Sequence, residues 1–110
     1  MSATLIPVAA RIAAALNIAN GTREHEAAMR LMKVAEEAGE ATAAYIGMTG
    51  QNPRKGISHT TADVADELCD VIIAAAVALH SFTATPAADL TAKLDAVARR
   101  LTTNAPQRDL

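Results

Sequence analysis

Two short segments of the sequence carry carboxylates at a spacing that suits a metal ion. The first holds Glu36, Glu37 and Glu40, and the second holds Glu67 and Asp70. On a helix, side chains three residues apart share one face with their Cβ atoms about 5–6 Å apart, so each segment offers a pair of carboxylates to one cation. If two such helices pack antiparallel with these faces opposed, four carboxylates converge. Carboxylate oxygens are hard ligands, which favour Mg²⁺, or Mn²⁺, over Zn²⁺.

The concentration of negative charge favours a site over an ordinary solvated surface. One acidic pair on an alanine-rich helix is usually a solvated face. Here seven of the twelve acidic residues fall in two stretches, in which Lys33 is the only basic residue. In a partly dry cleft these groups would repel one another, and a divalent cation would relieve the repulsion. A di-iron bundle would require Glu-x-x-His on its ligand helices, and neither segment has a His at that spacing.

Two helices are expected in the first half of the chain. Apolar residues at steps of three and four predict a helix over residues 4–18, ended by a glycine. Thr22 is a plausible N-cap for a second helix that continues to about Ile46 and carries the first acidic segment. Gly39 lies inside this helix, where glycine costs about 1 kcal/mol relative to alanine. Such a glycine suggests close approach of another helix or a ligand.

Two more helices are expected after a break. Residues 47–59 contain three glycines and a proline, and a connection of this length is often functional or mobile. Thr60 and Asp63 form a capping-box-like pair at the start of a third helix, which continues to about Ser81. Thr85-Pro86 predicts the start of the fourth helix, which fades before Pro106. We expect residues 104–110 to fray.

The composition indicates an all-α protein that shares its core between copies. The chain has 110 residues, of which 51% are hydrophobic and 2% aromatic, and a net charge of −2. We therefore predict one domain over residues 1–110, with the motifs in about 22–82, folded as a four-helix antiparallel bundle. Small side chains bury little apolar area, so a single copy would be marginal and a homodimer or homotetramer is expected. Residues 71–79 are apolar on every side of the third helix, which is typical of contact with another subunit.

The acidic segments resemble a known signature. The strings KVAEEAGEA and VADELCDVI are similar to the EExxE…ExxD pattern of the MazG-like all-α nucleotide pyrophosphohydrolases. NPRKG in the intervening loop resembles a feature of the short members of that family, and the similarity covers roughly residues 26–79.

The resemblance implies an activity and a set of site residues. Members cleave nucleoside triphosphates between the α and β phosphates, releasing a nucleoside monophosphate and pyrophosphate with the help of Mg²⁺. Carried over by position, the resemblance implies that the metal ligands are Glu37, Glu40, Glu67 and Asp70. It implies Glu36 as a further acid that orients the water or holds another metal, so that Glu36 and Glu37 are the catalytic candidates. Within the enzymes, hydrolysis of phosphoribosyl-ATP, dUTP or dCTP stays open.

Three basic residues are candidate substrate contacts. Arg54 and Lys55 lie beside glycines in the loop, where they either contact phosphates or belong to an ordinary solvated turn. Lys33 is the third candidate. It lies four residues before Glu37, so a plain helical ion pair is the alternative interpretation.

Other features of the sequence indicate the cellular compartment and the kinds of partner that this chain binds. The single cysteine, Cys69, excludes an intrachain disulfide and suits the cytoplasm, and its apolar neighbours predict a buried thiol. The first residues lack the basic start of a signal peptide, and residues 71–79 are too few to span a bilayer, which needs about 20. A chain with net negative charge and few aromatics is not expected to bind nucleic acid polymers. A non-enzymatic helical interaction module, with solvated acids, is the alternative class of function.

Overall fold

The computed structural model describes residues 3–104, and these residues form four α-helices and no strand. The all-α prediction is therefore confirmed for this part of the chain. Of the tail that we expect to fray, residues 105–110 lie outside the described residues, whereas Asn104 is the last residue of a helix. The helices are α1 (Leu5–Asn20), α2 (Glu24–Thr49), α3 (Thr61–Leu79) and α4 (Pro86–Asn104).

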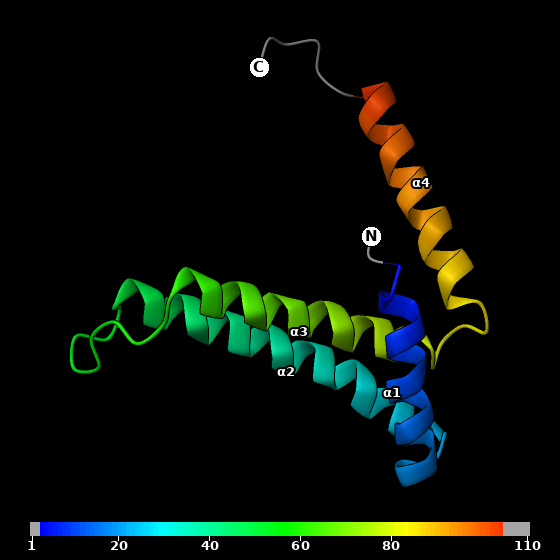
Figure 1. Cartoon of the computed structure of the whole chain (residues 1–110), viewed down its shortest axis with the longest axis horizontal. Helices are drawn as coiled ribbons and strands as arrows, with labels where there is room; N and C mark the ends of the chain where they lie inside the picture. The colour runs from blue at the N-terminus through cyan, green and yellow to red at the C-terminus, as the bar shows by residue number, and fades with distance from the viewer. Residues whose placement is uncertain (1–2, 105–110) are drawn as a thin grey trace.

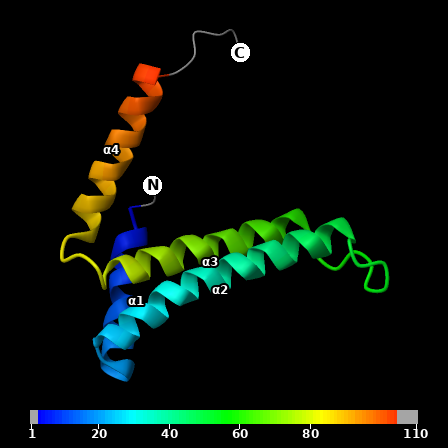
Figure 2. The ribbon, with the colours of Figure 1, turned by 180° about the vertical axis from the view of Figure 1, so that it is seen from behind.

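The core of the fold is an antiparallel hairpin of α2 and α3, which lie side by side along most of their lengths (Figures 1 and 2). Side-chain contacts near both ends fix how the two helices are aligned. Close to the connecting loop, Thr61 Oγ1 lies 3.7 Å from Met48 Sδ. At the other end, Arg30 Nη1 donates to Ser81 Oγ at 3.4 Å. This alignment places the middle of α2, with the first acidic segment, against the middle of α3.

The second helix is longer than its sequence pattern suggests. It ends at Thr49 rather than near Ile46, because Gly50 closes it in the left-handed conformation (φ 68°) and donates its N–H to the carbonyls of Gly47 and Ile46. A glycine is also required at Gly47, where a Cβ atom would lie 2.4 Å from Nδ1 of His59 in the returning loop. The loop is therefore folded back on the end of α2.

One local expectation about α2 is wrong, and the helix contact expected at Gly39 is not present within one copy. Arg23, not Thr22, occupies the N-cap position, and no side-chain hydrogen bond caps this end. The first turn instead carries Glu24 and Glu26, whose negative charge interacts favourably with the helix dipole. Gly39 has open space around it, since a Cβ atom there would meet nothing within 4 Å. Within one copy, no other element requires a glycine at this position.

The first helix crosses the hairpin and packs on α3 (Figure 1). Ala9 and Ala13 of α1 are buried against Ala76 and Val77 of α3. Small side chains at this crossing allow the two helices to approach closely, although each buries little apolar area. The seven buried hydrophobic residues of the described chain include no residue larger than valine. The core of one copy is therefore thin.

A buried arginine connects the elements at the open end of the hairpin by hydrogen bonds. Arg30 is 6% exposed, and its guanidinium donates to Glu26 Oε2 at 2.9 Å, to the carbonyl of Gly21 at 3.4 Å and to Ser81 Oγ. These contacts join the α1–α2 connection, α2 and the end of α3. The hydrogen bond from Arg30 holds the pKa of Glu26 below its usual value, which favours the ionised carboxylate.

The fourth helix does not complete a bundle within one copy. It points away from the hairpin (Figures 1 and 2), and in the described part of the chain it makes no extensive contact with another helix. The radius of gyration is 17.6 Å, whereas a compact chain of this length has about 13 Å. The antiparallel packing of α2 with α3 is consistent with a bundle, and α4 stands apart from these two helices. No helix among residues 3–104 is long and apolar enough to cross a membrane.

The capping box at the start of α3 offers a test of the fold. Thr60 Oγ1 accepts the backbone N–H of Asp63 at 3.2 Å, and Asp63 Oδ2 accepts the N–H of Thr60 at 2.8 Å, as the sequence predicts. We expect Thr60→Ala to lower the free energy of unfolding by about 1 kcal/mol in urea denaturation, because Asp63 N–H loses its side-chain acceptor. Thr22→Ala is the matched control and should change it by less than about 0.5 kcal/mol. Equal effects of the two substitutions would contradict this assignment of the caps.

Candidate metal centre

The antiparallel packing of α2 and α3 brings carboxylates of both helices together. Oxygens of Glu37, Glu67 and Asp70 all lie within 4.8 Å of one another. Oxygens of Glu36, Glu37 and Glu40 form a second group within the same limit. Glu37 belongs to both groups, so the two form one continuous acidic cluster. Three of the four predicted ligands therefore have oxygens close enough together to contact one ion. The fourth, Glu40, lies in the adjoining group.

The positions of these acids follow from the faces on which the helices pack. Glu37 shares the buried face of α2 with Ala41 and Ala44, at steps of four and three, so its carboxylate is directed at α3 and the residue is only 9% exposed. Glu67 and Asp70 are one turn apart on α3, and their carboxylates approach that of Glu37 from this helix. Alanines beside Glu37 let the helices approach closely enough for the oxygens to gather.

The cluster contains a carboxylate oxygen that lacks a partner. Glu67 Oε2 is buried and has no hydrogen-bond partner in the described part of the chain. Burial raises the pKa of Glu67, and the nearby charges of Glu40, Asp70 and Glu37 raise it further. The ionised form of Glu67 is thus penalised in the bare protein, and either a proton or a cation between the helices would relieve the penalty.

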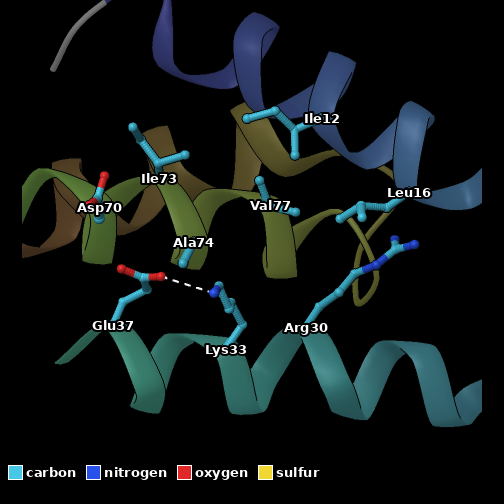
Figure 3. Close-up of a pocket in the computed structure, with 9 residues that line it drawn as sticks. All are labelled: Ile12, Leu16, Arg30, Lys33, Glu37, Asp70, Ile73, Ala74 and Val77. Carbon is cyan, nitrogen blue, oxygen red and sulfur yellow. Dashed lines mark ion pairs between the residues drawn. The ribbon is translucent and has the colours of Figure 1, made fainter. Parts of the chain in front are cut away.

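One basic side chain partly balances this charge. Lys33 forms an ion pair with Glu36. It forms a second ion pair with Glu37 at 3.1 Å (Figure 3). Its hydrogen bond to Glu36, followed by that to Glu37, raises the pKa of Lys33 above its usual value. The helical ion pair considered for Lys33 is therefore confirmed. A direct contact between Lys33 and a substrate stays a prediction.

A cavity of about 320 Å³ adjoins the acidic cluster. Its walls come from three helices (Figure 3): Glu37 and Lys33 from α2, Asp70 and Ile73 from α3, and apolar side chains from α1. The α1 side chains, Ile12 and Leu16, were not expected near a site. The only sequence signal for them was the apolar periodicity of the first helix, and periodicity does not tell which element a helix crosses.

The loop residues lie apart from the acidic cluster within one copy. Arg54 and Lys55 are exposed in the turn at the tip of the hairpin, where Asn52 accepts their backbone N–H groups at 3.1 Å. The last three turns of α2, about 18 Å of helix, separate Glu37 from Thr49 at the start of this loop. Neither side chain lines the cavity beside the acids. Their role in substrate binding stays a prediction.

The expectation of a buried thiol is wrong. Cys69 is exposed, because it lies two residues from Glu67 and therefore about 200° around α3 from the side that meets α2. Ile72 and Ile73, one turn further along the same side of α3, are exposed as well. The thiol takes no part in the acidic cluster.

Comparisons of the chain with protein-family models, with curated proteins and with solved structures found no match.

The raised pKa of Glu67 leads to a prediction for the metal-free protein. A carboxyl whose pKa is raised on folding destabilises the folded state progressively as pH rises above the unfolded value of about 4.5. Glu67→Gln removes that penalty, so it should raise the Tm at pH 7 in EDTA, and the gain should shrink as pH falls below about 4.5. Thermal unfolding followed by circular dichroism measures both effects.

Asp95→Asn, which neutralises an exposed acid of α4, is the control and should leave the Tm unchanged at both pH values. A lower Tm for Glu67→Gln at pH 7 would show that the carboxylate stabilises the bare fold, against this interpretation.

Proposed function

We propose that this chain is a divalent-cation-dependent nucleotide pyrophosphohydrolase of the MazG-like type, cleaving nucleoside triphosphates between the α and β phosphates. The observation that carries the proposal is the convergence of Glu37, Glu67 and Asp70 from two helices within 4.8 Å. The spacing of the same acids is what resembles that family. Base and sugar preference stay open, including phosphoribosyl-ATP, dUTP and dCTP as substrates.

The residues present fit Mg²⁺ or Mn²⁺. All ligand atoms in the cluster are carboxylate oxygens, which these cations prefer. The unpartnered Oε2 of Glu67 is an oxygen that a cation would satisfy. In our proposal Glu37, Glu67 and Asp70 hold the ion, and Glu40 binds beside them. When bound, such an ion neutralises phosphate charge and lowers the pKa of a coordinated water.

The surrounding side chains suit the other parts of a nucleotide. Ile12 and Leu16 form an apolar wall of the cavity, against which the nucleoside would pack. Lys33 lies at the acidic end of the same cavity, where its positive charge would face the phosphates. Glu36 is exposed next to Lys33, and in our proposal Glu36 or Glu37 accepts a proton from the attacking water.

We further propose that the enzyme works in the cytoplasm as a homodimer or homotetramer. The accessible surface of the chain is 8085 Å², about 2,300 Å² more than a compact monomer of 11.4 kDa exposes. Obligate dimers bury about 1,000–2,500 Å² on each partner, so the excess is of the size that another copy would cover. A reducing compartment suits the exposed single thiol of Cys69.

Metal binding separates the enzyme from a non-enzymatic interaction module. We expect Mg²⁺ or Mn²⁺ at 100 times its Kd to stabilise the protein at pH 7.5 by about 2.7 kcal/mol, which raises the Tm by roughly 10–20 °C for a chain of this size. The response should be lost in Glu37→Gln and should weaken as pH falls toward 4.5, because protons compete for Glu67. A module with solvated acids predicts no such response at millimolar Mg²⁺.

Activity is tested by pyrophosphate release across a panel of ribo- and deoxyribonucleoside triphosphates. We expect Mg²⁺-dependent release with at least one substrate, reduced about 100-fold or more in Glu37→Gln and in Asp70→Asn. The Asp95→Asn control should keep full activity. No release with any member of the panel, or release unchanged in both site variants, would refute the proposal. The double change Arg54→Ala with Lys55→Ala should raise KM more than it lowers kcat if the loop binds phosphates.

A further inference from the structure

Arg30 is a buried charged side chain that the acidic cluster does not use. It lies at the end of the 320 Å³ cavity farther from Glu37 (Figure 3), seven residues or about 10 Å back along α2. Lys33 lies between the two on the same face of the helix. The cavity therefore has an acidic end and a guanidinium end, and the apolar side chains of Ile12 and Leu16 also line it.

The guanidinium of Arg30 is balanced in charge but keeps unused hydrogen-bond donors. Its Nε donates to Glu26 Oε2 at 2.9 Å, so the two charges offset each other and little attraction for a phosphate is left. A guanidinium has five N–H groups. Nη1 donates to Ser81 Oγ and Nη2 to the carbonyl of Gly21, both at 3.4 Å, which is long for a hydrogen bond. The other two N–H groups have no partner among residues 3–104.

A second cavity, of about 180 Å³, follows the first toward the open end of the hairpin. Arg30 lines both cavities, and Val77 lines the first whereas Ser81, four residues further along the chain, lines the second. The side chains around the second cavity are mostly polar and come from α1, α2 and the turn after α3. Besides Arg30 and Ser81 they include Asn17 and His80. A few polar groups that converge on a cavity are what orients a bound ligand.

His80 adds a hydrogen-bond acceptor to this donor-rich place. Its Nδ1 lies 2.8 Å from the carbonyl oxygen of Ala76. A carbonyl oxygen only accepts, so Nδ1 carries the hydrogen, and Nε2 of the neutral ring is then an acceptor. The second cavity thus combines the N–H donors of Arg30 with a ring nitrogen that accepts.

We propose that Arg30 and His80 read the base of the nucleotide and select keto bases over amino bases, an assignment that rests on the proposed function. The phosphates then lie at the acidic end of the first cavity and the base edge lies at the guanidinium end. Guanine, hypoxanthine and uracil present a carbonyl acceptor beside a ring N–H donor, which an arginine donor and a histidine acceptor complement. Adenine and cytosine present an amino donor beside a ring acceptor at the same edge, so donors would face donors.

The burial of Arg30 makes this recognition selective. The residue is only 6% exposed, and a buried donor that faces no acceptor is penalised because water does not replace the missing partner. Sites built to hydrogen-bond a substrate group reject analogues that lack it more strongly than apolar pockets do. A bidentate arginine contact discriminates between bases by roughly 5–150-fold. Because Arg30 lies about 10 Å along α2 from Glu37, we expect the selection to act on binding.

Matched pairs of substrates test this selection in the full-length protein with Mg²⁺ at pH 7.5. ITP and ATP differ in whether the base carries a carbonyl or an amino group at this edge, as do UTP and CTP. We expect kcat/KM of wild type to be about tenfold or more higher for the keto member of each pair, mainly through KM. Arg30→Lys keeps the charge but loses the planar fork, so it should lower each ratio about fivefold or more. Arg99→Lys, an exposed arginine of α4, is the matched control and should keep both ratios.

Binding without catalysis gives a second readout. In EDTA, isothermal titration calorimetry should show IMP binding to wild type about fivefold or more tighter than AMP, and Arg30→Lys should remove the difference. If Arg30→Lys loses its helical signal in circular dichroism, His80→Leu serves instead. It removes the ring acceptor without changing the ion pair of Arg30 with Glu26, and it should reduce the same preference.

The outcomes separate this assignment from the proposed function. Pyrophosphate release at equal kcat/KM within both substrate pairs would overturn the selection by Arg30 and leave the proposed function standing. A lower Tm of Arg30→Lys with unchanged ratios would also overturn it, since Arg30 would then only connect the helices. No hydrolysis of any nucleotide would refute the proposed function, and the base selection with it.

Discussion

The alignment of α2 with α3 is the constraint on which the other features of this molecule depend. It sets Glu37 opposite Glu67 and Asp70, and it buries small residues such as Ala41 of α2 and Ala78 of α3. A slip of one helical turn, about 5.4 Å, would separate the carboxylates of the two helices. The contacts at the ends of the hairpin, Arg30 with Ser81 and Met48 with Thr61, oppose such a slip.

Repulsion among the carboxylates of the acidic cluster opposes the helix packing that brings them together. Alanines between the helices allow close approach, and that approach brings Glu37 and Glu67 together out of water. Lys33 offsets part of the repulsion from the solvent side, but Glu67 keeps an oxygen without a partner. A fold that gathers negative charge at such a position sacrifices stability there, which is typical of a site that binds a ligand of opposite charge.

The hairpin has two chemically different sides. One side carries the acids, the cavity and the crossing helix α1, whereas the opposite side presents uncharged residues in heptad spacing. The thin core of a single copy and the unpaired α4 both leave apolar surface to be covered. The acidic cluster and the uncharged residues therefore lie on different sides of the hairpin.

Local geometry accounts for what the sequence by itself determined. Helix positions, the capping box of Thr60 with Asp63 and the pairing of acids three residues apart all follow from helix periodicity and backbone hydrogen bonding within a few residues. Only the tertiary structure decided that α1 adds Ile12 and Leu16 to the cavity, that Cys69 is exposed and that α4 stands apart. These outcomes depend on which helix faces pack together over long distances in the chain, and a helical pattern specifies an apolar face without specifying its partner.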